Sequence, residues 1–149
     1  MARFLSELLT GKKPLPQPYD GSVLQLPLTF VFGTVAPAVG DILALLELPP
    51  YTDLLDYDIF AAQLDSNATP LLTFSLGQEN VALTDLAAVY EAGLTFGRTA
   101  NGSCNRATTA MQQLADTTVP RKLALKVTAA AATWAGAGKT VTALLMLRG

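Results

Sequence analysis

The sequence has no histidine and only one cysteine, Cys104. Histidine is the commonest general base, the usual partner of a nucleophilic side chain and the commonest zinc ligand, so its absence removes three kinds of site at once. A single cysteine excludes an internal disulfide. Only Arg106 stands near Cys104 to favour a thiolate, so we interpret this cysteine as a structural thiol. Carboxylate chemistry stays open, but the sequence predicts no enzyme activity, no cofactor and no metal.

Charged residues are scarce as well. They make up 15% of the 149 residues, against about 25% in a typical globular protein, whereas 50% of the residues are hydrophobic. This composition predicts little free surface, as in a subunit of a larger assembly. The net charge of −2 disfavours nucleic-acid binding, which needs clustered lysine and arginine. No apolar run reaches the roughly 18 residues of a membrane-spanning helix, and Glu7 interrupts the only run that could form a signal peptide. We therefore expect no nucleic-acid partner and no membrane partner.

Two motifs suggest ligand sites but lack the required spacing. The segment Gly136-Ala137-Gly138-Lys139-Thr140 looks like a phosphate-binding loop, but Thr133 stands where such a loop needs its first glycine. We interpret it as a turn and the start of a strand, with Lys139 at the surface. A group of aspartates could suggest Ca²⁺, but the central glycine and terminal glutamate of a calcium loop are missing. The group comprises Asp53, Asp56, Asp58 and Asp65, and we interpret it as solvated carboxylates, since Asp56 and Asp58 alternate outward along a strand.

The first twenty residues differ from the rest. A short apolar stretch ends at Thr10-Gly11, and proline then alternates with other residues from Lys13 to Tyr19. Prolines fix φ and bias the preceding residues towards extended geometry, so residues 1–20 are predicted to form an extended N-terminal arm. A disordered tail is the alternative. Apolar side chains, which a solvated tail does not need, favour an arm that binds a partner: Phe4, Leu5, Leu8, Leu9, Leu15 and Tyr19.

Residues 21–149 are predicted to form one β-sandwich domain. Apolar residues recur at every second position in several segments, and glycine- or asparagine-rich turns separate them. The first row runs from Leu24 to Phe32, and Pro27 within it indicates an edge strand. Short strands at this spacing are typical of a sandwich or jelly roll. One short helix is predicted from Thr84 or Asp85 to Gly93, and residues 107–114 are predicted to be irregular or a strand.

The C-terminal segments Arg121–Thr128 and Thr140–Arg148 read as two strands of a closing hairpin, joined by an alanine- and glycine-rich turn. The second of them is apolar on both faces, because Leu144 and Met146 lie opposite Val141, Ala143, Leu145 and Leu147. A strand of this kind is usually covered on both sides. Leu144 and Met146 are therefore candidates for a subunit interface.

Three segments carry a resemblance to a known class of proteins. They are Gly33–Ile42 leading to Leu48-Pro49, then Asp65–Gly77, and Leu125–Thr140. Their order is similar to that in the decoration proteins of tailed-bacteriophage capsids, also called cement or head auxiliary proteins. The resemblance implies an all-β, jelly-roll-like β-sandwich, often a trimer, without enzyme activity. It implies a structural protein on the outer surface of the virion capsid, made in the host cytoplasm.

In that setting the partner is the major capsid protein, and residues 1–20 would clamp neighbouring subunits of the shell. Deleting residues 2–19 should then lower the occupancy of the capsid. The alternative function is a phage tail or receptor-recognition module, which should expose aromatic residues on its loops. Aromatic residues make up only 7% of the chain, which disfavours that alternative.

Overall fold

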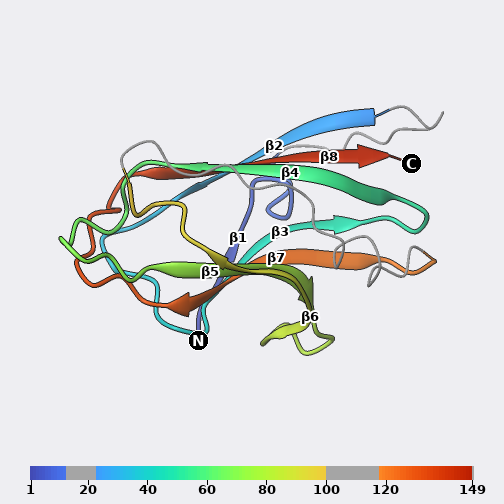
Figure 1. Ribbon diagram of the computed structural model, residues 1–149. Helices are drawn as coiled ribbons and strands as arrows, with labels where there is room; N and C mark the ends of the chain where they lie inside the picture. Colours follow the sequence, from blue (N-terminus) through green and yellow to red (C-terminus); the bar gives the residue numbers. More distant parts are fainter. Residues whose placement is uncertain (13–22, 100–117, 149) are drawn as a thin grey trace.

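Strands are the only regular secondary structure in the described residues of the computed structural model, which are 1–12, 23–99 and 118–148 (Figure 1). The all-β prediction is therefore confirmed. No helix long and apolar enough to cross a membrane occurs in these ranges. The strands are β1 (Arg3–Leu5), β2 (Val23–Val31), β3 (Ile42–Leu48), β4 (Asp53–Ala61), β5 (Thr73–Glu79), β6 (Leu86–Leu94), β7 (Arg121–Ala129) and β8 (Thr140–Arg148).

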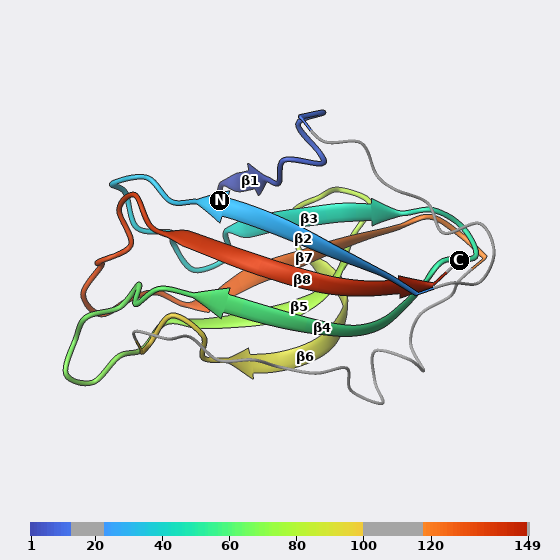
Figure 2. The ribbon, with the colours of Figure 1, turned by 90° about the horizontal axis from the view of Figure 1, so that it is seen from above.

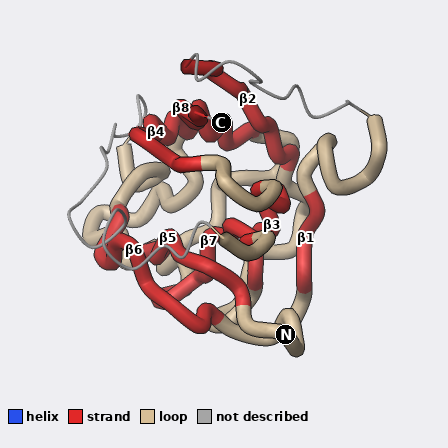
Figure 3. Tube along the Cα trace, turned by 90° about the vertical axis from the view of Figure 1, so that its right-hand side faces the viewer, coloured by secondary structure: helices blue, strands red, loops and turns tan. Residues whose placement is uncertain are grey.

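The strands form two sheets that pack face to face as a β-sandwich (Figure 3). The five-stranded sheet has the order β1-β3-β7-β5-β6, and the three-stranded sheet has the order β2-β8-β4. Figure 2, a view from above, shows the three-stranded sheet lying over the five-stranded sheet. Neighbouring strands are antiparallel, apart from β1, which runs parallel to β3. The pairs are nested along the chain, because β2 pairs with β8 and β3 pairs with β7.

The inward-facing residues of both sheets fill the space between them. On β2 the alternation predicted from the sequence is confirmed, since Leu26, Leu28 and Phe30 are each at most 6% exposed. Pro27 does lie on an edge strand. Phe74 of β5 stacks on Phe96, with ring centroids 4.4 Å apart. Each such side chain contributes about 1.5–3 kcal/mol by its burial, so this core is the main source of stability.

The helix predicted between Thr84 and Gly93 is wrong, because this segment contains strand β6. Thr84 and Asp85 were candidate helix caps, but their N–H groups donate to the Asn80 side chain at 2.9 and 3.3 Å and shape the loop between β5 and β6. The buried residues Tyr90 and Leu94 are four positions apart. This spacing suits one face of a helix and equally one face of a strand, so the pattern could not separate the two. Pairing with β5 decides for the strand.

The closing hairpin is also wrong, although both of its strands exist. β7 lies between β3 and β5 in the five-stranded sheet, whereas β8 lies between β2 and β4 in the other sheet. The alanine- and glycine-rich segment between them therefore crosses from one layer to the other. The connection consists of residues 130–139. It is longer than the loops of about two to five residues that are common in hairpins.

The Asp65 carboxylate fixes this crossing. It is fully buried and accepts backbone N–H groups from Ala132 and Thr133 of the crossing segment, at 2.9 and 3.0 Å. It also accepts N–H groups from its own loop, at 2.8 Å from Leu71, 3.2 Å from Leu72 and 3.2 Å from Asn67. Burial alone would raise the pKa of Asp65, but these N–H groups outweigh it and hold the pKa well below its ordinary value. Asp65 is thus a buried anchor for two loops and not a solvated carboxylate.

Candidate partner-binding site

The N-terminal residues form the end strand of the five-stranded sheet. Ile42 donates its N–H to the carbonyl of Ala2 at 2.9 Å, and Ser6 donates its N–H to the carbonyl of Ala44 at 3.1 Å. The Asp41 carboxylate accepts the N–H of Ala2 at 2.6 Å. The start of the predicted arm is therefore held on the chain's own sheet.

An ion pair strengthens this attachment. The Arg3 guanidinium donates two hydrogen bonds to the Glu79 carboxylate, both at 2.9 Å, and the Glu79 side chain is fully buried. These hydrogen bonds raise the pKa of Arg3 although partial burial opposes them. Strands β3 and β7 lie between β1 and β5, so the pair reaches across two strands. On this face Ala44 and Ala124 are neighbours in register, and their small side chains leave room for the guanidinium.

A turn follows β1 and packs against a bulge in β3. The bulge lies between Ala44 and Leu46, and the Ser6 hydroxyl donates a hydrogen bond to the carbonyl of Leu45 within it. Further backbone bonds close the turn, from Thr10 to Ser6 at 3.1 Å and from Lys12 to Glu7 at 3.0 Å. The side chains of this turn are therefore held in fixed positions beside the edge of the sandwich.

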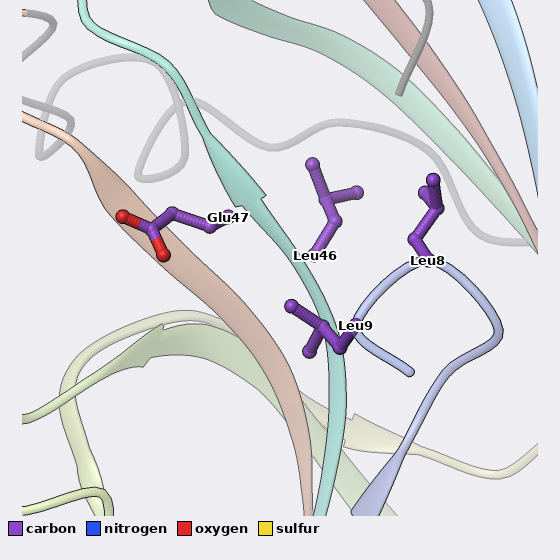
Figure 4. A pocket seen from close by; sticks show the side chains of 4 residues that line it. All are labelled: Leu8, Leu9, Leu46 and Glu47. Carbon is purple, nitrogen blue, oxygen red and sulfur yellow. The ribbon is translucent and has the colours of Figure 1, made fainter. Parts of the chain in front are cut away.

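Two open cavities flank this segment. The first has a volume of about 190 Å³ and is lined by Leu8 and Leu9 of the turn and by Leu46 and Glu47 of β3 (Figure 4). The second has a volume of about 250 Å³ and lies between the N-terminal segment and the edge strand β2. Its lining residues are Phe4, Leu5, Glu7, Thr10, Lys12, Thr29, Phe30 and Val31.

Four of the six predicted arm residues thus line cavities at one edge of the molecule. Phe4 is 37% exposed and Leu5 is 44% exposed, so large apolar side chains face solvent there. Leu15 and Tyr19 lie outside the described residues. That these side chains bind a partner stays a prediction, as does the division of the chain after residue 20.

The two candidate interface residues lie on the outer face of the three-stranded sheet. Leu144 stands between Pro27 and Asp58 in register, and Met146 stands between Gln25 and Asp56. Both side chains are partly exposed. The two-sided apolar character of β8 is therefore present in the fold, whereas the partner that would cover this face stays a prediction.

The glycine-rich segment before β8 is a turn. Lys139 donates its N–H to the carbonyl of Gly136 at 2.9 Å, and its ammonium group donates to the carbonyl of Gln63 at 2.7 Å. The Trp134 ring fills the space beside Gly136, since a Cβ atom there would lie 2.4 Å from the ring. The interpretation as a turn and strand start is confirmed, but Lys139 is engaged with a neighbouring loop. No group of three or more acidic or cysteine side chains that could hold a metal ion occurs among the described residues.

These features define a class: a β-sandwich protein with two open cavities along one edge, beside a fixed N-terminal strand. No protein-family model matches the chain, and no curated protein is significantly similar to it in sequence.

Solved structures are similar, however. A chain in the capsid of Ralstonia phage GP4 is 27% identical with a TM-score of 0.81, over 99% of this chain and 97% of that one. A chain in the capsid asymmetric unit of cyanophage Pam1 is 22% identical with a TM-score of 0.67, over 93% of this chain and 94% of that one. The second similarity establishes the fold alone. The first supports a capsid-related structural protein of a phage virion.

Proposed function

We propose that this chain is a decoration, or cement, subunit that binds the outer surface of a phage capsid and strengthens the shell. The observation that carries the proposal is the similarity to a chain of the GP4 capsid over almost the full length of both chains. A match of that extent concerns the whole sandwich, including its N-terminal edge.

The low content of charged residues and the exposed side chains of Phe4 and Leu5 support a role in assembly. The partner in this proposal is the major capsid protein, and the subunit acts as a homotrimer in the mature virion after synthesis in the host cytoplasm. We also propose that the chain is not an enzyme, since it has no histidine to serve as a general base.

The nested strand pairs support a jelly-roll arrangement for this subunit. In a long β-hairpin that folds over as one unit, the first strand pairs with the last and the second with the one before it. β2 with β8 and β3 with β7 follow this order, and β5 pairs with its chain neighbour β6.

The proposal is tested by adding the purified chain to capsid shells that lack it and measuring both binding and the temperature at which the shells break. Saturable binding and a higher breaking temperature are expected. A chain that does not bind the shells, or that is found only on tails of the intact phage, would overturn the proposal.

The structure also changes how the N-terminal residues should be tested. Deleting residues 2–19 removes β1 and leaves the buried Glu79 carboxylate without Arg3. A loss of binding after this deletion could therefore result from damage to the sheet. Substitutions of exposed side chains separate the two effects, and Val31, which is 69% exposed, is a suitable position.

A further inference from the structure

Within the described ranges the sandwich has four edge strands, and three of them carry features that hinder the addition of another strand. β2 contains Pro27, which has no N–H to donate. β4 has a bulge between Leu54 and Asp56 and carries several aspartates. β6 shows three shifts of register against β5. Bulges, prolines and charges are the usual means by which proteins keep their sheet edges from pairing.

β1 is only three residues long, and its one charged side chain, Arg3, is paired with Glu79 across the face of the sheet. Its residues Arg3–Leu5 contain no proline, and its register against β3 is regular. In the described residues it ends the five-stranded sheet. An unprotected edge strand is a template for pairing with another extended chain.

The hydrogen bonds between β1 and β3 show which way the backbone groups of β1 point. The carbonyl of Ala2 and the N–H of Ser6 point towards β3. Because these groups alternate along a strand, the N–H and carbonyl groups of Arg3 and Leu5 point away from the sheet. Two donors and two acceptors are therefore offered on the outer side of β1.

The surroundings of this edge suit an apolar strand. The 250 Å³ cavity lies beside it, between β1 and the edge of β2. Phe4 and Leu5 line this cavity from β1, and Val31 lines it from β2. Phe4 and Leu5 point to opposite faces of the sheet, so alternate side chains of a strand added to β1 would lie beside Phe4 on one face and beside Leu5 on the other. The bonds of Ala2 and Ser6 and the Arg3–Glu79 ion pair hold β1 in place, so the template is formed before a partner arrives.

We propose that the outer edge of β1 binds an extended, apolar segment of the shell protein as an additional β-strand. This inference rests on the proposed function, because the shell protein is its partner. Main-chain hydrogen bonds to Arg3 and Leu5 supply the affinity, and the apolar part of the cavity, formed by Phe4, Leu5 and Val31, selects the side chains. The added strand closes the gap between the edges of the two sheets and buries Phe4, Leu5 and Val31.

The test uses Leu5→Pro in the full chain and shells that lack the chain. Proline removes the outward N–H of residue 5, whereas the bonds from β1 to β3 do not use that group. We expect the variant to keep its fold and thermal transition but to lose at least tenfold in affinity for the shells. The matched control Leu5→Val keeps the N–H and should bind within about threefold of the unmodified chain, because the main-chain bond is the same.

A second variant guards against a folding defect. Val31→Glu places a charge in the cavity from β2, without touching β1, and should also weaken binding. Amide hydrogen exchange measures the proposed main-chain bond directly, since the Leu5 N–H should become protected when the unmodified chain binds shells.

The outcomes separate this inference from the proposed function. If the unmodified chain does not bind shells, the proposed function fails. If it binds, and both Leu5→Pro and Val31→Glu bind equally well, strand addition at β1 is wrong. If Leu5→Pro alters the oligomeric state in solution and leaves shell binding unchanged, the edge pairs with a second copy, which also overturns the inference.

Discussion

Replacing Asp65 by asparagine should destabilise the protein strongly. In the native carboxylate, one oxygen accepts two backbone N–H groups and the other accepts three. An asparagine amide has only one acceptor oxygen. Even if that oxygen takes the place that accepts three N–H groups, the other two N–H groups lose their acceptor and face an NH₂ group instead.

The magnitude follows from these lost bonds. A buried donor without a partner costs about 1–3 kcal/mol, and hydrogen bonds to a charged group are worth about 1.5–3 kcal/mol. We therefore expect Asp65→Asn to lower the free energy of unfolding by about 3–5 kcal/mol at pH 7. For a domain of this size that corresponds to a fall of roughly 6–20 °C in the melting temperature.

The assay is urea denaturation of the parent and the variant between pH 7 and pH 2. The native pKa of Asp65 lies below that of the unfolded chain, which is about 3.9. The stabilising effect is therefore complete above about pH 5 and is lost as the pH falls towards the native pKa, so the difference between the two proteins should shrink in acid.

The control is Asp53→Asn, the same chemical change at an exposed site. Asp53 accepts a hydrogen bond from Arg148 at 3.4 Å, with both side chains at least 40% exposed, and such pairs contribute about 0–1 kcal/mol. A loss below 1 kcal/mol for Asp65→Asn, or a difference that stays constant down to pH 2, would refute the account of Asp65 as an anchor.

Three further predictions concern other fixed points of the fold. Arg3→Met should lower the free energy of unfolding by about 2–4 kcal/mol in urea denaturation, because it leaves the buried Glu79 carboxylate unpaired, whereas Arg3→Lys should recover part of the loss. Gly136→Ala should lower it by about 1–3 kcal/mol, since the new methyl group meets the Trp134 ring; an unchanged transition would contradict that packing. Burial and the hydrogen bond to Glu91 raise the pKa of Tyr57. Burial raises the pKa of Tyr90 as well. Two tyrosines should therefore resist ionisation in an absorbance titration, stability should fall above about pH 10, and Tyr57→Phe should remove one of the two components.

Much of the sandwich could be predicted from residue alternation. Burial alternates strictly along the row from Leu26 to Phe32 and along the strand from Thr140 to Arg148, because each has one face in the core. In the second strand Leu144 and Met146 interrupt the alternation of residue types. The pattern fails where a strand is covered on both sides. β3 reads Ile-Leu-Ala-Leu-Leu and is buried on both faces, and the Arg3 side chain crosses its outer face to reach Glu79.

The remaining errors come from long-range pairing. Whether β7 and β8 form a hairpin depends on the crossing segment, and the bonds from Asp65 to Ala132 and Thr133 join residues far apart in the sequence. The short apolar stretch at the N-terminus indicated that Phe4 and Leu8 contact something. It could not indicate that part of the contact is the chain's own sheet, because the Arg3–Glu79 pair has no local signal.

The most direct measurement for the proposed function is a cryo-electron microscopy map of capsids purified from the intact phage. We expect density for this β-sandwich on the outer surface of the shell, with the edge formed by β1 and β2 facing the major capsid protein. An extended segment of that protein should lie alongside Arg3 and Leu5. Capsids without this density, or density for the sandwich only at the tail, would contradict the account.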